Sequence, residues 1–204
     1  MELEVVFTEI IKAATALTWH EVSAVFFSLL YVIYAAKNHA ICWVFGIIGC
    51  AFWAYCAFFL YDLWLDAGLQ VLYIGISFLG IYRWLYGKEK SELPITKWSF
   101  KTHLGLIIGG VFLSVLAGML FKEYTPAAAT YPDAFTTVFS IIATFMVIQR
   151  KLENWIYWMV IDAVYVFLYA ARGGWLFSVL FVLYLGMAVY GYFNWRKLHV
   201  GNLD

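Results

Sequence analysis

One stretch of the sequence, NWIYWMVIDAVYVFLYA at 154–170, places a single acid among aromatic side chains at helical spacing. At 100° per residue, five of these side chains fall within about 80° of one helix face. They are Trp155, Trp158, Asp162, Tyr165 and Tyr169. A charged carboxylate at mid-span in a membrane costs roughly 2.5–3.5 kcal/mol on insertion scales. We therefore expect Asp162 to face protein or a wet cavity, either as a ligand-binding group or as a hydrogen-bonded acid that fixes helix packing.

This set of side chains suits a flat polar ring as ligand, cationic rings included. A cation over the face of a tryptophan gains roughly 0.5–2 kcal/mol, and more when it is desolvated. A carboxylate beside the rings adds a partner for a positive charge or for sugar hydroxyls. The alternative is that the aromatic stripe is only a packing surface between helices.

The composition requires a membrane around this helix. Hydrophobic residues make up 65% of the 204 residues and charged residues 13%, against about 45–50% and about 25% in soluble domains. One small core cannot bury this excess, so lipid must cover much of the surface. The net charge of zero leaves no electrostatic footprint for a nucleic-acid partner.

Apolar runs separated by polar breaks predict an all-α integral membrane protein with seven spans. They cover about 19–36, 41–61, 65–86, 103–121, 133–148, 154–171 and 174–195. The segment before the first span lacks the basic n-region of a cleaved signal peptide and carries Glu2, Glu4 and Glu9 instead. We expect it to form a short interfacial helix.

Lysine and arginine are unevenly distributed between the two ends of these spans. Ten lie on the side that holds the C-terminus and three on the other, which predicts a cytoplasmic C-terminus and an external N-terminus. The ten are Lys37, Arg83, Lys88, Lys90, Lys97, Lys101, Arg150, Lys151, Arg196 and Lys197, and the three are Lys12, Lys122 and Arg172.

The second half of the chain repeats the first. VLYIGISFLGIYRW at 71–84 matches VLYLGMAVYGYFNW at 182–195, and Trp43 matches Trp155 at nearly the same offset. With one span as a linker, both copies cross the membrane in the same direction. We therefore expect 3+1+3 parallel repeats. The parts are 1–86 with the interfacial segment and three spans, 87–132 with the fourth span, and 133–204 with the last three spans.

The first copy places small residues where the second has a ring and an acid. At the offset that relates Trp43 to Trp155, Gly46 takes the place of Trp158 and Cys50 takes the place of Asp162. This difference suits a ligand that lies between the two halves. It equally suits close packing of helices, and both can hold.

Further candidates lie outside the opening stripe. Gln70 and Tyr73 share one face of the third span, and the Gln70 amide needs hydrogen-bond partners in an apolar environment. An interhelical hydrogen bond would satisfy Gln70 as well as a ligand would. Asn154 is a further amide candidate near a span end, and Trp53 is the counterpart of Tyr165 in the other copy.

The sequence contains no arrangement typical of catalysis or of metal binding. Cys42, Cys50 and Cys56 match no zinc spacing. The histidines lie at span ends or in the tail, and no phosphate loop or Ser/His/Asp set is visible. We expect no enzymatic activity, no cofactor and no metal site.

Several segments resemble the PnuC nicotinamide riboside transporter family along nearly the whole chain. They are FGII (45–48), LQVLY (69–73), DAFTTVFSIIA (133–143), ENWIYW (153–158) and GYFNWRK (191–197). The pair Trp155 and Trp158 is the hallmark of that family. The resemblance implies seven helices in a SWEET-like 3+1+3 arrangement and a homo-oligomer, a trimer, in the bacterial inner membrane. It also implies facilitated diffusion of the vitamin, which is trapped by cytoplasmic phosphorylation for NAD biosynthesis.

The resemblance also implies roles for the candidate residues, because nicotinamide riboside combines a pyridinium cation with a ribose. Trp155 and Trp158 should contact the pyridinium region. Asp162, Gln70 and Asn154 should hydrogen-bond polar groups of the ligand. The cavity should be walled by Trp43, Trp53, Tyr73, Tyr165 and Tyr169.

The resemblance leaves the choice of vitamin open. Asp162 departs from family members that carry Asn at this position, and close relatives transport thiamine, whose aminopyrimidine can pair with a carboxylate. A thiamine permease is therefore one alternative, and a non-transporting membrane sensor or assembly subunit is another. An ion-coupled carrier is disfavoured because Asp162 is the one mid-span acid found in the sequence.

Overall fold

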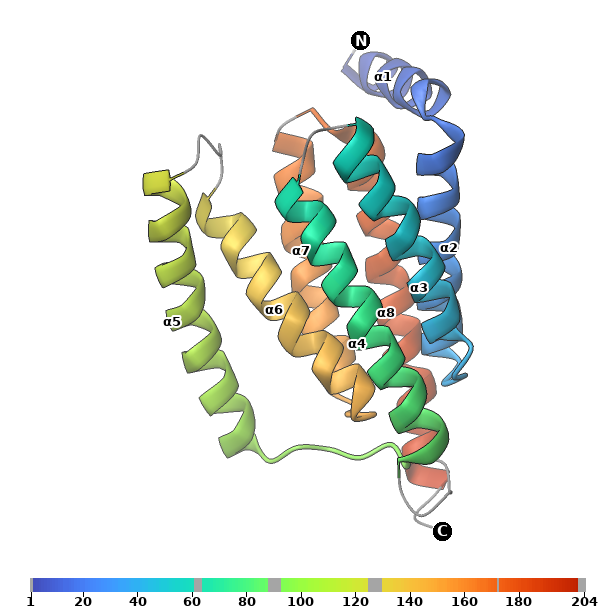
Figure 1. Cartoon of the computed structure of the whole chain (residues 1–204), viewed down its shortest axis with the longest axis vertical. Helices are drawn as coiled ribbons and strands as arrows, with labels where there is room; N and C mark the ends of the chain where they lie inside the picture. The colour runs from blue at the N-terminus through green and yellow to red at the C-terminus, as the bar shows by residue number, and fades with distance from the viewer. Residues whose placement is uncertain (1, 61–63, 88–92, 125–129, 172, 202–204) are drawn as a thin grey trace. The chain divides into compact units, whose positions relative to one another are not determined.

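The computed structural model describes residues 2–60, 64–87, 93–124, 130–171 and 173–201, and this part of the chain is mostly helical (Figure 1). The helices are α1 (Glu2–Ala16), α2 (Trp19–Ala36), α3 (Cys42–Tyr55) with its π-helical continuation η1 (Cys56–Leu60), α4 (Trp64–Tyr86), α5 (Phe100–Tyr124), α6 (Thr130–Ile148), α7 (Asn154–Ala171) and α8 (Trp175–Gly201). The predicted end of the second span at residue 61, and Lys88, Lys90 and Arg172 of the charge count, lie outside the described residues.

Seven helices of the described part are long and apolar enough to cross a membrane, which confirms the predicted all-α class and number of spans. They are α2 to α8, with α3 and η1 forming one span. The bounds of α7 agree with the predicted 154–171. α8 continues to Gly201, beyond the predicted 195, because charged residues outside the lipid can extend a helix.

The first span begins at a capping box. The backbone N–H of Thr18 donates to the carboxylate of Glu21 at 2.8 Å, and the N–H of Glu21 donates back to the Thr18 hydroxyl at 3.4 Å. Each contact satisfies a backbone donor that the first helical turn leaves without a partner. This local chemistry separates α1 from α2.

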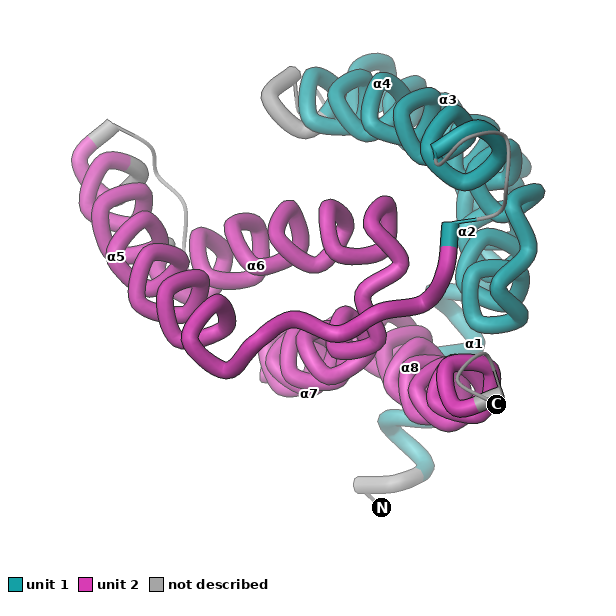
Figure 2. The backbone as a smooth tube through the Cα atoms, turned by 90° about the horizontal axis from the view of Figure 1, so that it is seen from below, with its two compact units in different colours: residues 1–93 teal, residues 94–204 magenta. Residues whose placement is uncertain are grey.

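The chain forms two compact units, 1–93 and 94–204 (Figure 2). In the first unit, α3 packs against both α2 and α4. In the second unit, α5 packs against α6, α6 against α7, and α7 against α8. The division into three parts expected from the sequence stays a prediction.

The turns α2–α3 and α6–α7 have the same backbone structure at equivalent positions of the two predicted repeats. Asn38 and Arg150 both adopt the left-handed conformation, with φ of 57° and 48°. The N–H of each donates to the carbonyl three residues earlier, and the following N–H donates to the carbonyl five residues earlier, all at 2.9 Å. This is the Schellman arrangement that ends a helix by satisfying its last carbonyls.

Each helix that follows one of these turns carries, as its second residue, a tryptophan that packs against a tryptophan of the next helix. Trp43 on α3 meets Trp84 on α4 edge to face, with ring centroids 5.6 Å apart and an interplanar angle of 88°. Trp155 on α7 meets Trp195 on α8 in the same way, at 5.5 Å and 88°. Each pair therefore joins the second and third helices of a predicted repeat.

A glycine makes room for one ring of each tryptophan pair. A Cβ at Gly80 would lie 2.4 Å from the Trp43 ring, and a Cβ at Gly191 would lie 2.7 Å from the Trp155 ring. Only the absence of a side chain lets these helices approach with the indole between them.

Candidate functional site

The ten predicted ligand residues divide between the two units. Six lie on α7, namely Asn154, Trp155, Trp158, Asp162, Tyr165 and Tyr169. The other four lie on α3 and α4, namely Trp43, Trp53, Gln70 and Tyr73. Each group is described within its own unit.

Trp155 faces α8. Its ring packs over Gly191 and against Trp195, and only 3% of its surface is exposed. The indole Nε1 is buried and has no hydrogen-bond partner in the described part of the chain. A buried donor without a partner lowers the stability of the protein by about 1–3 kcal/mol. A ligand or water that offers an acceptor to this nitrogen would therefore bind more favourably.

Trp158, three residues further along α7, packs toward α6. It lies against a buried apolar cluster of Phe139, Ala143 and Ile161. The face of α7 that the sequence defines as one stripe therefore spans two neighbours, with Trp155 on the α8 side and Trp158 on the α6 side.

Asp162 lies one helical turn beyond Trp158 and is 4% exposed. Its carboxylate is sheltered from lipid, as the cost of a mid-span charge requires. Tyr165, on the next turn, packs against the same buried apolar cluster as Trp158. Along α7, Asp162 therefore lies between two aromatic residues that pack toward α6.

Tyr165 and Tyr169 are held by an aromatic ring of α8. Phe181 stacks on Tyr165 with centroids 4.4 Å apart and on Tyr169 at 5.5 Å. Phe181 occupies the position that Gln70 holds in the first predicted repeat. The stack joins this end of the stripe to α8.

Asn154 is the first residue of α7 and is fully buried. Its Nδ2 donates to the carbonyl of Lys151 at 2.7 Å, which helps to shape the α6–α7 turn. Its Oδ1 is buried without a hydrogen-bond partner among the described residues. The Nδ2 group of Asn154 therefore has a structural role, and its Oδ1 atom can accept a hydrogen bond from a ligand.

In the first unit, Trp43 is 1% exposed and contacts Tyr31 edge to face as well as Trp84. Trp53, Gln70 and Tyr73 are half-buried.

The small residues predicted in the first unit lie where the sequence suggested close approach. A Cβ at Gly46 would lie 3.1 Å from the Tyr31 ring and 3.4 Å from Ser77 Oγ. The Ser77 hydroxyl itself donates to the carbonyl of Tyr73 at 2.8 Å. These contacts leave little spare room beside Gly46, which favours packing as its role.

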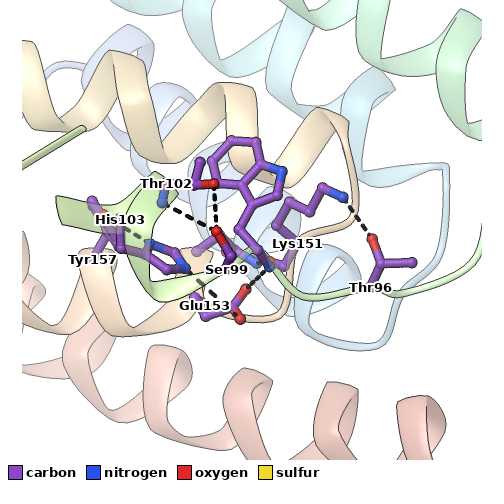
Figure 3. Close-up of polar contacts among 9 residues, drawn as sticks. Thr96, Ser99, Thr102, His103, Lys151, Glu153 and Tyr157 are labelled. Carbon is purple, nitrogen blue, oxygen red and sulfur yellow. Dashed lines mark hydrogen bonds and ion pairs between the residues drawn. The ribbon is translucent and has the colours of Figure 1, made fainter. Parts of the chain in front are cut away.

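A polar network at the start of α7 was not predicted from the sequence (Figure 3). His103 on α5 lies 3.1 Å from the Tyr157 hydroxyl and 3.8 Å from the Glu153 carboxylate. His103 belongs to the part 87–132 predicted from the sequence, and no sequence signal indicates its contact with α7.

Lys151, in the turn between α6 and α7, belongs to the same network. Burial lowers the pKa of its ammonium, and the nearby Glu153 carboxylate partly opposes this change.

Among the described residues, no group of three or more His, Cys, Asp or Glu side chains is arranged to hold a metal ion.

Residues 18–197 match the family model of the nicotinamide mononucleotide transporters. The match includes all seven candidate spans apart from the last turn of α8. The chain belongs to this family. Because it is a family of transporters, the prediction of a membrane transporter rather than an enzyme is confirmed.

Two individual transporters are similar to this chain. The nicotinamide riboside transporter PnuC of Neisseria mucosa is 24% identical over 201 residues, which cover 89% of this chain and 73% of that protein. The riboflavin/roseoflavin transporter RibM of Streptomyces davaonensis is 27% identical over 134 residues, covering 64% of this chain and 63% of that protein.

A solved structure of this family has the same fold. The crystal structure of the vitamin B3 transporter PnuC aligns with a TM-score of 0.73 over 97% of this chain and 89% of that one, at 23% identity. The family membership and the seven candidate spans together establish a multi-pass membrane protein. The resemblance to PnuC found in the sequence is thereby confirmed.

Proposed function

We propose that this protein is a permease that carries nicotinamide riboside across the membrane by facilitated diffusion. The observation that carries the proposal is Asp162, a nearly buried carboxylate that shares a face of α7 with Trp158 and Tyr165. Nicotinamide riboside offers a flat cationic ring for the aromatic faces and hydroxyls for the polar groups. The name of the Neisseria mucosa relative supports this choice of vitamin.

The riboside fits this helix better than the mononucleotide that the family is named after. Phosphate groups are bound by arginine, lysine or backbone N–H groups. The α7 sequence contains one acid and no lysine or arginine. A phosphate near Asp162 would meet a like charge in a poorly solvated site, whereas ribose hydroxyls can donate to the carboxylate.

We assign roles to the α7 residues as follows. Trp155 and Trp158 contact the pyridinium region, while Asp162 and Asn154 hydrogen-bond polar groups of the ligand. The buried, unpaired Asn154 Oδ1 and Trp155 Nε1 support these roles, since they offer one acceptor and one donor. Tyr165 and Tyr169 form the aromatic wall.

The first unit contributes the remaining ligand residues in this proposal. Gln70 hydrogen-bonds the ligand, and Trp43, Trp53 and Tyr73 line the cavity. Trp43 Nε1 is buried without a hydrogen-bond partner among the described residues, as is its counterpart Trp155 Nε1.

The transport step that we propose is alternating access between two parallel three-helix repeats, with α5 as the linker. The matching Schellman turns and the matching Trp–Gly contacts support the repeat, because they recur at equivalent positions of the two copies. Rocking of one repeat against the other would expose the site to each side in turn. Cytoplasmic phosphorylation of the vitamin for NAD biosynthesis would give the flux its direction.

The cellular setting that we propose is the bacterial inner membrane, with the N-terminus outside and the C-terminus in the cytoplasm. The asymmetry of lysine and arginine supports this orientation. The resemblance to PnuC adds a homo-oligomer, a trimer, as the assembled form.

Two other vitamins remain candidates for the same site. Thiamine is a cationic aromatic compound whose aminopyrimidine can pair with the Asp162 carboxylate. Riboflavin is favoured by one observation, the similarity to the riboflavin/roseoflavin transporter RibM. Because riboflavin carries no positive charge, it would make less use of the acid.

Calorimetric titration of the purified protein with nicotinamide riboside, thiamine and riboflavin tests the choice of vitamin. We expect nicotinamide riboside to bind most tightly. Tight binding of thiamine or riboflavin alone would overturn our choice. Uptake of the labelled vitamin into proteoliposomes then separates a permease from a sensor or assembly subunit, because a sensor binds the vitamin without flux.

A further inference from the structure

A polar network at the start of α7 is not used by the proposed function (Figure 3). It joins the extended segment before α5, the first turn of α5, the α6–α7 turn and the first turn of α7. Its half-buried side chains are those of Thr96, Trp98, His103, Lys151, Glu153 and Tyr157. All of them belong to the second unit.

The first part of the network fastens the extended segment to the α6–α7 turn. The N–H of Thr96 donates to the carbonyl of Arg150 at 3.0 Å, and the N–H of Leu152 donates to the carbonyl of Thr96 at 2.9 Å. Lys151 Nζ donates to the Thr96 hydroxyl at 2.7 Å and lies 5.6 Å from the centre of the Trp98 ring. These short contacts fix the residues that immediately precede α7.

The second part of the network joins α7 itself to α5. His103 Nδ1 lies 3.1 Å from the Tyr157 hydroxyl, and His103 Nε2 lies 3.8 Å from Glu153 Oε1. The other oxygen, Glu153 Oε2, accepts a hydrogen bond from the backbone N–H of Trp98 at 3.4 Å. Glu153 and Tyr157 therefore share one partner, the His103 ring, and should act as a unit.

This anchor lies on a different face of α7 from the ligand stripe. Glu153 and Tyr157 are four residues apart and share one face. At 100° per residue, that face is about 120–160° around the helix from the centre of the stripe that runs from Trp155 to Tyr169. The Tyr157 ring packs against the same buried cluster as Trp158, but its hydroxyl and the Glu153 carboxylate contact His103. These polar groups can therefore set the position and rotation of α7 from outside the stripe.

We propose that Glu153 and Tyr157 are positioning residues for ligand binding, which hold the first turns of α7 against α5 so that Asn154, Trp155 and Trp158 meet the ligand correctly. This inference rests on the proposed function, since it concerns the same ligand residues. It assigns to the 96–103 region a task that neither the spans nor the stripe predicted.

The sharpest test is Tyr157→Phe, which removes one hydroxyl and keeps the ring. Tyr190→Phe is the matched control, because Tyr190 is an exposed tyrosine of α8. We expect Tyr157→Phe to raise the Kd for nicotinamide riboside about three- to tenfold, the effect of one lost hydrogen bond. Tyr190→Phe should leave the Kd within about twofold of the parent.

A double-mutant cycle separates positioning from a general loss of stability. Glu153→Gln removes the charge that faces His103, and Glu9→Gln makes the same change on the exposed surface of α1. If the two residues act as a unit, Glu153→Gln combined with Tyr157→Phe should raise the Kd little more than one change alone. A merely structural role would lower the melting temperature and leave the Kd of the folded protein unchanged.

Hydrogen–deuterium exchange without ligand provides a readout that is independent of the proposed function. We expect backbone amides of 153–158 to exchange about three- to tenfold faster in Tyr157→Phe than in Tyr190→Phe. If the parent binds the riboside and Tyr157→Phe binds it equally well, the inference is overturned and the proposed function stands. If the parent binds none of the three vitamins, the proposed function fails. Equal exchange rates in Tyr157→Phe and Tyr190→Phe would show that the Tyr157 hydroxyl does not hold the start of α7.

Discussion

Asp162 is the residue whose chemistry distinguishes the three candidate vitamins. It is 4% exposed on a membrane-spanning helix, with Trp158 and Tyr165 one turn away on either side. A cationic ring gains from a nearby carboxylate in a poorly solvated site, while a neutral ring gains only hydrogen bonds. The effect of removing the charge therefore depends on which vitamin binds.

We predict that Asp162→Asn, which keeps the shape of the side chain, weakens binding of nicotinamide riboside about tenfold or more. A hydrogen bond to a charged group contributes about 1.5–3 kcal/mol, which exceeds the contribution of a neutral one. Calorimetric titration of parent and variant measures the change in Kd. Riboflavin, as the uncharged comparison ligand, should lose less than about threefold. Unchanged affinity for the riboside would show that Asp162 has only a packing role.

The burial of Asp162 could be predicted from the sequence, but the directions of its neighbours could not. A mid-span charge has few alternatives to the protein interior, so one residue type determines the outcome. Trp155 and Trp158 are both suited to many apolar environments, and an arc of about 80° is wide enough to reach two neighbouring helices. Only the three-dimensional structure shows that Trp155 packs on the α8 side, against Gly191, and that Trp158 packs on the α6 side, against the cluster that includes Phe139.

At the scale of elements, glycines determine how closely the tryptophan-bearing helices approach. A Cβ at Gly191 of α8 would lie 2.7 Å from the Trp155 ring, whereas a Cβ at Gly186 of the same helix would meet nothing within 4 Å. The first unit offers the same contrast on α4, between Gly80 beside Trp43 and the open Gly75. The chain therefore supplies two matched pairs of positions.

We predict that Gly191→Ala and Gly80→Ala each destabilise the protein by about 1–3 kcal/mol, because the added methyl group overpacks a rigid buried ring. Gly186→Ala and Gly75→Ala should be neutral or slightly stabilising, since alanine is the better helix former. Thermal unfolding of the detergent-purified variants, followed by tryptophan fluorescence, measures the difference. Equal melting temperatures within each pair would contradict the close packing of these helices.

The sequence predicts which helices exist better than where they end. Hydrophobic runs locate the spans because lipid demands them, and the bounds of α7 follow directly from such a run. The turns before α3 and α7 are less visible, since their left-handed residues are Asn38 and Arg150 rather than glycine. These two turns are spaced as Trp43 and Trp155 are, and this constant offset is the signal that would have linked them.

At the scale of the whole molecule, the second unit contains contacts that could not be predicted from the sequence. Thr96 and His103 belong to the predicted part 87–132, and they contact the α6–α7 turn and α7 of the following part. Such contacts join residues more than fifty positions apart, between Thr96 and Lys151 for example. Neither hydropathy nor periodicity carries information about pairs at that separation.

The orientation in the membrane can be decided by labelling introduced cysteines from one side. Thr8 on α1 and Lys97 before α5 are exposed and are separated by three candidate spans, so they should lie on opposite sides. Because lysine and arginine concentrate on the Lys97 side, that side should be cytoplasmic. In spheroplasts of a bacterial expression host, an impermeant maleimide should label Thr8→Cys and reach Lys97→Cys only after lysis. The parent protein, with three native cysteines that are buried or half-buried, gives the background. The reverse pattern would invert the proposed topology, and labelling of both positions from outside would contradict three intervening spans.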